Sequence, residues 1–125
     1  MYTYVVTNNT MVSEKLDGIM EVYLFPEDDA MQILIKARDR IHLGDKLVAH
    51  PMAGRIRPNE SPYKTVLLER HQGELDIMSF TVIEDSIAMV KKYIEGGMPI
   101  HYGEVLDDLA MIDWELLKSA LDEMS

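Results

Sequence analysis

The chain has 125 residues, of which 12 are Lys or Arg and 22 are Asp or Glu, so its formal net charge is −10. Apolar residues make up 47% and charged residues 27%, a composition that excludes a disordered or fibrous chain. Cysteine is absent, which excludes disulfides and thiolate chemistry and favours a reducing compartment. The acidic balance disfavours nucleic-acid binding, and no apolar run exceeds four residues, so we expect a cytoplasmic protein without a membrane span.

The first third of the chain reads as strand, helix, strand. Tyr2–Val6 is rich in aromatic and β-branched residues and predicts a first strand. Turn and N-cap residues follow at 7–10 and predict a short helix that ends at Gly18. Met20–Phe25 predicts a second strand, closed by Pro26.

The next segments continue the alternation. Ala30–Ile41 has apolar residues at three- and four-residue spacing and predicts a helix that stops at Gly44. Lys46–His50 and Thr65–Glu69 predict a third and a fourth strand. The spacing of apolar residues over Phe80–Ile94 predicts a long helix.

Alternating strands and helices predict an α/β fold, a single three-layer domain with a mainly parallel four-stranded sheet. Short right-handed crossovers favour the strand order 2-1-3-4. We expect this domain to span residues 1–97.

Residues 98–125 predict an acidic amphipathic helical tail. Trp114, Leu117 and Leu121 form its apolar stripe, and Asp113 is placed as the N-cap of its helix. This stripe can pack on the domain itself or on a neighbouring subunit, and the second arrangement would make the protein a homo-oligomer.

The segment 50–64 is the best candidate for a site. It has 15 residues between two predicted strands, where such loops usually run about 2–6 residues. Residues 46–64 hold four bases and only one acid, Glu60, inside an acidic chain. Residues two apart on extended backbone point the same way, about 7 Å apart, so we expect Arg55 and Arg57 to suit a carboxylate or phosphate.

A sheet that reverses its strand order between strands 1 and 3 would place this segment beside the exit of the first strand. The sequence therefore predicts an anion-binding site. Its residues are Asn8, Asn9, His50, Arg55, Arg57, Asn59, Tyr63 and Lys64.

The same residues also suit purely structural roles. The two asparagines also suit helix capping, the arginines also suit pairing with the chain's own acids, and His50 also suits a backbone-bonded structural role. No catalytic constellation, metal-ligand spacing or glycine-rich phosphate loop occurs, so no catalytic residue, metal or cofactor is assigned, and a non-enzymatic role is favoured.

Thr7-Asn8-Asn9, together with His50-Pro51-Met52-Ala53-Gly54 and Pro58-Asn59-Glu60-Ser61-Pro62-Tyr63-Lys64, resembles the GrdX family. These small proteins are encoded beside the glycine, sarcosine and betaine reductase components of anaerobic bacteria that ferment amino acids. The resemblance runs from the first strand through the helix that ends near Glu95.

The resemblance implies an accessory or regulatory role in the reductase system, with a reductase component or a small anionic metabolite as the partner. It carries over no catalytic residues. The alternative is a small enzyme or metabolite-binding protein that acts on a carboxylate or phosphate compound.

Overall fold

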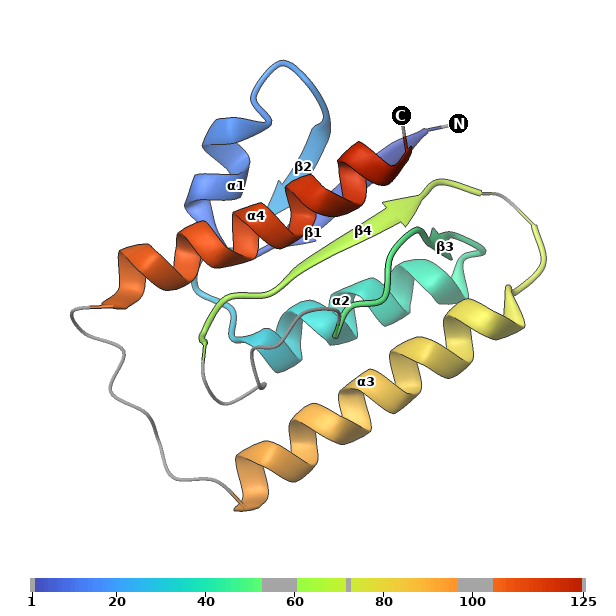
Figure 1. Ribbon diagram of the computed structural model, residues 1–125. Helices are drawn as coiled ribbons and strands as arrows, with labels where there is room; N and C mark the ends of the chain where they lie inside the picture. The colour runs from blue at the N-terminus through green and yellow to red at the C-terminus, as the bar shows by residue number, and fades with distance from the viewer. Residues whose placement is uncertain (1, 53–60, 72, 97–104, 125) are drawn as a thin grey trace.

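The computed structural model describes residues 2–52, 61–71, 73–96 and 105–124. Helices cover both faces of one sheet, with α1 and α4 on one side and α2 and α3 on the other (Figure 1). In chain order the elements are β1 (Thr3–Thr7), α1 (Thr10–Lys15), β2 (Glu21–Leu24), α2 (Ala30–His42), β3 (Lys46–Leu47), β4 (Thr65–Glu69), α3 (Ile77–Gly96) and α4 (Leu106–Met124).

The sheet is mixed, with the strand order β2-β1-β4-β3. β1 pairs in parallel with β2, but β4 runs antiparallel to both of its neighbours, β1 and β3. The predicted order 2-1-3-4 and the mainly parallel sheet are therefore wrong. The prediction of an α/β fold with four strands and a helix near the C-terminus agrees with the structure.

Burial explains why β4, and not β3, lies beside β1. Val66, Leu67 and Leu68 are all buried, so β4 is apolar on both faces, as a central strand must be. β3 has only two half-buried residues and takes the edge. β4 therefore lies between β1 and the edge strand β3 and pairs antiparallel with both.

Local signals set the ends of α2. Asp29 accepts from the backbone N–H of Gln32, whose side chain accepts from the backbone N–H of Asp29, which forms a capping box. At the other end Gly44 has a φ of +107°, and a Cβ there would lie 2.9 Å from the carbonyl oxygens of His71 and Gly73. Only glycine fits at this close approach.

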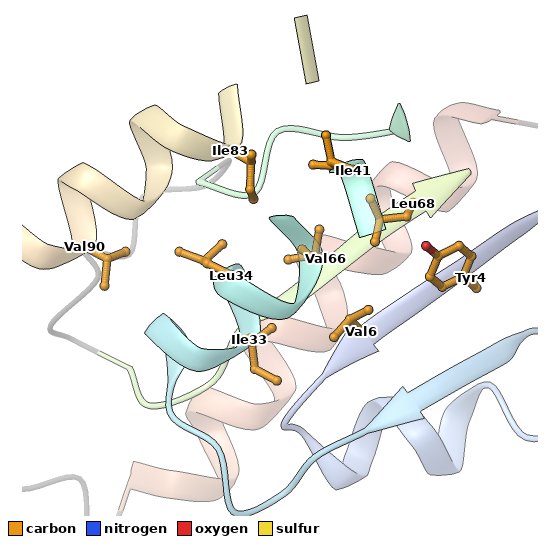
Figure 2. Close-up of a cluster of buried hydrophobic side chains, with 10 residues drawn as sticks. Tyr4, Val6, Ile33, Leu34, Ile41, Val66, Leu68, Ile83 and Val90 are labelled. Atoms are coloured by element: carbon orange, nitrogen blue, oxygen red, sulfur yellow. The ribbon is translucent and has the colours of Figure 1, made fainter. Parts of the chain in front are cut away.

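The larger core lies between the sheet and helices α2 and α3 (Figure 2). The residues at the predicted three- and four-residue spacing in α2 are all buried, which confirms that prediction; they are Ala30, Ile33, Leu34, Ala37 and Ile41. Fully burying an aliphatic side chain stabilises a fold by about 1.5–3 kcal/mol. The buried residues of this core are Tyr4, Val6, Ile33, Leu34, Ala37, Ile41, Val66, Leu68, Ile83 and Val90.

A smaller core on the opposite face holds α1 and α4 against the sheet. Val5 and Leu67 contribute from the strands, and Leu117 contributes from α4, with Trp114 and Leu121 packed beside it. The tail helix thus lies on the chain's own sheet. In the described ranges, no helix is both long enough and apolar enough to cross a membrane.

The antiparallel pairing of β3 with β4 can be tested by cross-linking, because the chain has no cysteine of its own. Lys46 pairs with Glu69, and antiparallel partners have Cα atoms about 4.5–5.5 Å apart, within the range of a disulfide. We expect Lys46→Cys/Glu69→Cys to form an intramolecular disulfide on mild oxidation, detected by peptide mass mapping.

The matched control is Lys46→Cys/Thr65→Cys. In the structure these positions lie four residues out of register, about 13 Å along the strand, and should stay reduced. Preferential cross-linking of the control pair would indicate a parallel arrangement and contradict the observed sheet.

Candidate functional site

The exit of β1 is tied to the chain just before β4. The side-chain N–H groups of Asn8 donate to the carbonyl oxygens of Pro62 at 2.8 Å and Asp28 at 2.9 Å. Its side-chain oxygen accepts from the backbone N–H of Lys64 at 2.9 Å. The strand exit thus meets the end of segment 50–64, where Asn8 holds the two together, but the neighbouring strand is the antiparallel β4 and not the predicted third strand.

Asn9 caps α1 and also reaches α4. Its side-chain oxygen accepts from the backbone N–H of Met11 at 3.1 Å, which is the N-cap role. Its side-chain N–H groups donate to the carbonyl oxygen of Ala110 at 2.9 Å and to Oδ2 of Asp113 at 3.0 Å. Asn9 is only 1% exposed, so this link between the two helices is buried.

A chain of hydroxyl groups continues from Asp113 into the sheet. The hydroxyl of Thr65 donates to Oδ2 of Asp113 at 2.6 Å. The hydroxyl oxygens of Thr7 and Thr65 are 2.6 Å apart. Because the Thr65 hydroxyl already donates its proton to Asp113, Thr7 must be the donor in this second hydrogen bond. Burial raises the pKa of Asp113, while the hydrogen bonds from Thr65 and Asn9 act in the opposite direction.

Lys64 brings a positive charge to the same region. Its Nζ donates to the carbonyl oxygen of Pro51 at 2.8 Å and lies 3.6 Å from Sδ of Met52. Burial lowers the pKa of Lys64, and the negative charge of Asp113 opposes that effect. Among the described residues Lys64 forms no direct ion pair.

Lys64 and Asp113 both line a small hollow of about 60 Å³. A pocket for a nucleotide-sized or drug-sized ligand has about 300–1,000 Å³, so this hollow suits a much smaller molecule. Within the described ranges no group of three His, Asp or Glu side chains could hold a metal ion. The lining residues are Ala49, His50, Pro51, Lys64, Thr65, Leu67, Asp113, Leu116, Leu117 and Ala120.

Two of the predicted anion-binding residues, His50 and Lys64, line this hollow. His50 is exposed, and its Nδ1 accepts from the backbone N–H of Met52 at 3.1 Å. Tyr63 is half-buried next to Lys64 but does not line the hollow. Three further predicted residues lie outside the described part of the chain: Arg55, Arg57 and Asn59.

Sequence reasoning missed Asp113 as a site residue. The prediction that it caps the start of the tail helix is wrong, because α4 begins at Leu106 and Asp113 lies in its interior. The available signal was helical spacing. Asp113 lies three residues after Ala110 and four before Leu117, both buried, so it falls on the apolar face of the helix.

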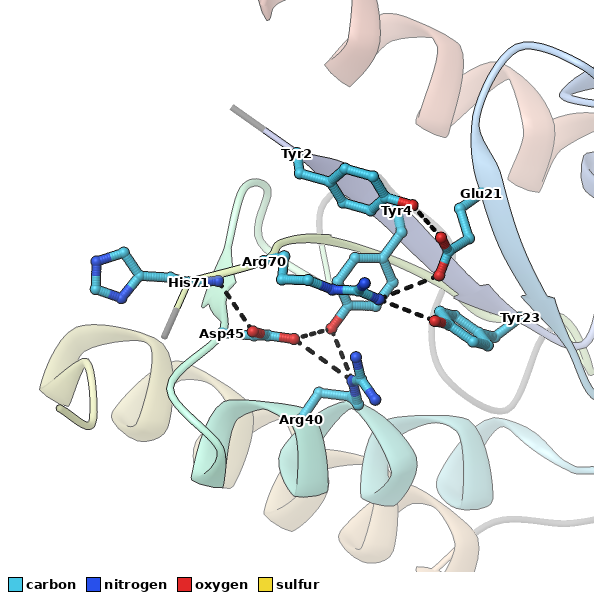
Figure 3. A network of polar contacts seen from close by, with 8 residues as sticks. All are labelled: Tyr2, Tyr4, Glu21, Tyr23, Arg40, Asp45, Arg70 and His71. Atoms are coloured by element: carbon cyan, nitrogen blue, oxygen red, sulfur yellow. Dashed lines mark hydrogen bonds and ion pairs between the residues drawn. The ribbon is translucent and has the colours of Figure 1, made fainter. Parts of the chain in front are cut away.

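A second polar cluster lies at the other end of β1 (Figure 3). The Tyr4 hydroxyl donates to Asp45 and accepts from Nε of Arg40 at 3.0 Å. Arg40 also pairs with the Asp45 carboxylate at 3.4 Å. Burial raises the pKa of Tyr4, and the hydrogen bond to Asp45 adds to that effect.

Arg70 completes this second cluster from the end of β4. Its guanidinium donates to the hydroxyl of Tyr23 at 2.9 Å and to the carboxylate of Glu21 at 3.1 Å. It also lies over the rings of Tyr2 and Tyr4, with distances to the ring centroids of 4.8 and 5.2 Å. Both arginines of the cluster are therefore paired directly with a carboxylate of the chain (Figure 3).

The sequence model of the GrdX-like protein family matches residues 4–122. The match extends past Glu95, where the resemblance seen in the motifs ends, and includes nearly all of α4, with Asp113. No curated protein and no solved structure matches the chain.

Replacing Asp113 with Asn should change how stability depends on pH. Because burial raises the pKa of Asp113, the folded state holds this proton more tightly than the unfolded chain, where the pKa is about 3.9. That stabilisation is complete below the unfolded pKa and is lost as the pH rises through the raised pKa. The free energy of unfolding of Asp113→Asn minus that of the wild type should therefore increase from about pH 4 upward, measured by urea denaturation.

Glu115→Gln, an exposed change on the same helix, is the matched control. Its difference from the wild type should vary less with pH than that of Asp113→Asn. If the Asp113→Asn difference is flat or falls with rising pH, burial does not dominate the environment of this carboxyl group.

Proposed function

The chain belongs to the GrdX-like protein family, and on that basis we propose that it is an accessory or regulatory protein of the glycine, sarcosine and betaine reductase system. In this proposal it binds a small ligand through an anionic group at the hollow beside Lys64. The family's gene association with the reductase components supports the first part. The geometry around Lys64 supports the second.

The environment of the Lys64 ammonium group is the observation that carries the ligand proposal. Lys64 lines the hollow, and its ammonium group has the Pro51 carbonyl oxygen and the Met52 sulfur as its neighbours. Neither neighbour is an anion, and no described carboxylate is in direct contact. A desolvated ammonium group gains most from a negatively charged partner, and a carboxylate or phosphate entering the hollow would supply one.

The absence of cysteine supports an accessory role over an electron-transferring one. A protein that passes electrons through thiols needs at least one cysteine, and this chain has none. A thiol-based redox step within the reductase system therefore has to take place on another component. Binding of a metabolite or of a reductase subunit remains as the contribution of this chain.

Replacing Lys64 with Met should abolish anion binding at the hollow. With acetate, inorganic phosphate or acetyl phosphate at about 100 times Kd, a bound ligand stabilises the folded state by about 2.7 kcal/mol. We expect the melting temperature of the wild type to rise with at least one of these compounds. The rise should disappear in Lys64→Met.

Lys118→Met is the matched control, because Lys118 is exposed on α4 and does not line the hollow. It should keep the ligand-dependent rise of the wild type. Equal shifts in Lys64→Met and the wild type would contradict binding at this hollow.

The accessory role predicts a physical association with the reductase. Immobilised full-length protein should retain at least one purified reductase component, and an unrelated acidic protein of similar size should not. Retention is measured by mass spectrometry at low and at physiological salt, because exposed ion pairs weaken as salt rises. If no component is retained at either salt concentration, the protein does not act through direct binding to the reductase.

A further inference from the structure

We propose that the hollow binds a small zwitterion of the amino-acid type, whose carboxylate contacts Lys64 and whose ammonium group contacts Asp113. The contact between the ligand's carboxylate and Lys64 rests on the proposed function. The contact between the ligand's ammonium group and Asp113 is new, because the proposed anion site does not involve Asp113.

Two opposite charges reach the hollow from different elements. Lys64 lies directly before β4, and Asp113 lies inside α4. Separate hydrogen bonds hold each group in place, since the Lys64 ammonium group donates to the Pro51 carbonyl and the Asp113 carboxylate accepts from Thr65 and Asn9. In the described part of the chain the two groups form no direct ion pair, although each acts electrostatically on the other.

In the second polar cluster, by comparison, oppositely charged side chains form direct ion pairs. There the guanidinium groups of Arg40 and Arg70 lie 3.4 and 3.1 Å from the carboxylates of Asp45 and Glu21 (Figure 3). At the hollow, by contrast, burial acts against the charged form of both Lys64 and Asp113. A simple anion would supply a counter-ion to one of these groups, whereas a zwitterion supplies one to each.

The charge of the whole protein favours the same class of ligand. The chain carries a net charge of −10, which repels a free anion at long range. Asp107, Asp108 and Glu115 add negative charge along the exposed side of α4. A zwitterion has no net charge, so it reaches Lys64 without this repulsion.

The size and walls of the hollow limit the ligand. Its volume is about 60 Å³, and a water molecule needs about 10–15 Å³ of such space, so only a few non-hydrogen atoms fit. The buried Leu67 and Leu117 form apolar walls that suit a short carbon backbone. Glycine, the smallest amino acid, is the appropriate probe.

The test is an NMR titration of the isotope-labelled full-length protein, which detects the weak binding expected of so small a ligand. Glycine is compared with acetate, which has only the negative group, and with methylammonium, which has only the positive group. We expect glycine to bind at least about tenfold more tightly than either and to shift the backbone signals of Thr65 and Asp113.

Two variants test which residue contacts the carboxylate of glycine and which contacts its ammonium group. Asp113→Asn should lower the affinity for glycine to that for acetate while leaving acetate binding in place, and the exposed control Glu115→Gln should behave as the wild type. Lys64→Met should lose both ligands. The wild-type comparison needs no variant, so it decides the question even if Asp113→Asn fails to fold.

The outcomes separate this inference from the proposed function. If acetate binds as tightly as glycine, the anion site stands and the zwitterion inference is wrong. If glycine binds but Asp113→Asn leaves its affinity unchanged, the ammonium contact is wrong. If neither acetate nor glycine binds at the hollow, both the inference and the proposed ligand site fail.

Discussion

The antiparallel pairing of β1 with β4 positions the polar groups of the candidate site. In this register Thr7 lies opposite Thr65, so their hydroxyls meet and Lys64 lies next to the strand exit at Asn8. The pairing also makes Val5 and Leu67 neighbours on the face that α4 covers. α4 then brings Asp113 over the end of the strand pair. A sheet with β3 beside β1 would have none of these contacts.

The two ends of β1 differ in whether the charged side chains there are paired directly with one another. At the start of the strand, arginines, tyrosines and carboxylates are in direct contact with one another (Figure 3). At the exit, hydrogen bonds hold Lys64 and Asp113 on the wall of a hollow without direct pairing in the described part of the chain. The half-buried Lys64 and Asp113 are hydrogen-bonded but not paired with each other, and the ligand proposal rests on that difference between the two ends of the strand.

The extent of the family match bears on the role of α4. The match covers residues 4–122 and therefore includes nearly all of this helix. Leu117 packs in the smaller core and Asp113 hydrogen-bonds with Asn9 and Thr65, so α4 contributes both to stability and to the candidate site. It is part of the fold shared by the family, and the ligand proposed for the hollow would contact it directly.

Local sequence determined most of the elements, because helix periodicity and capping act within a few residues. The stripe of α2, the capping role of Asn9 and the strand Thr65–Glu69 are all observed as expected from the sequence. The end of segment 50–64 does meet Asn8, but through the antiparallel β4 and not through the strand order that the sequence argument used. Arg55 and Arg57 lie outside the described residues.

Strand order, strand direction and the place of Asp113 were decided only by tertiary structure. β3 and β4 both read as strands, and the choice of neighbour for β1 depends on which of them can bury both faces against helices from distant parts of the chain. Asp113 likewise becomes a site residue only when α4 packs across the β1–β4 pair. Such contacts depend on the combined packing of residues far apart in sequence, which no local pattern encodes.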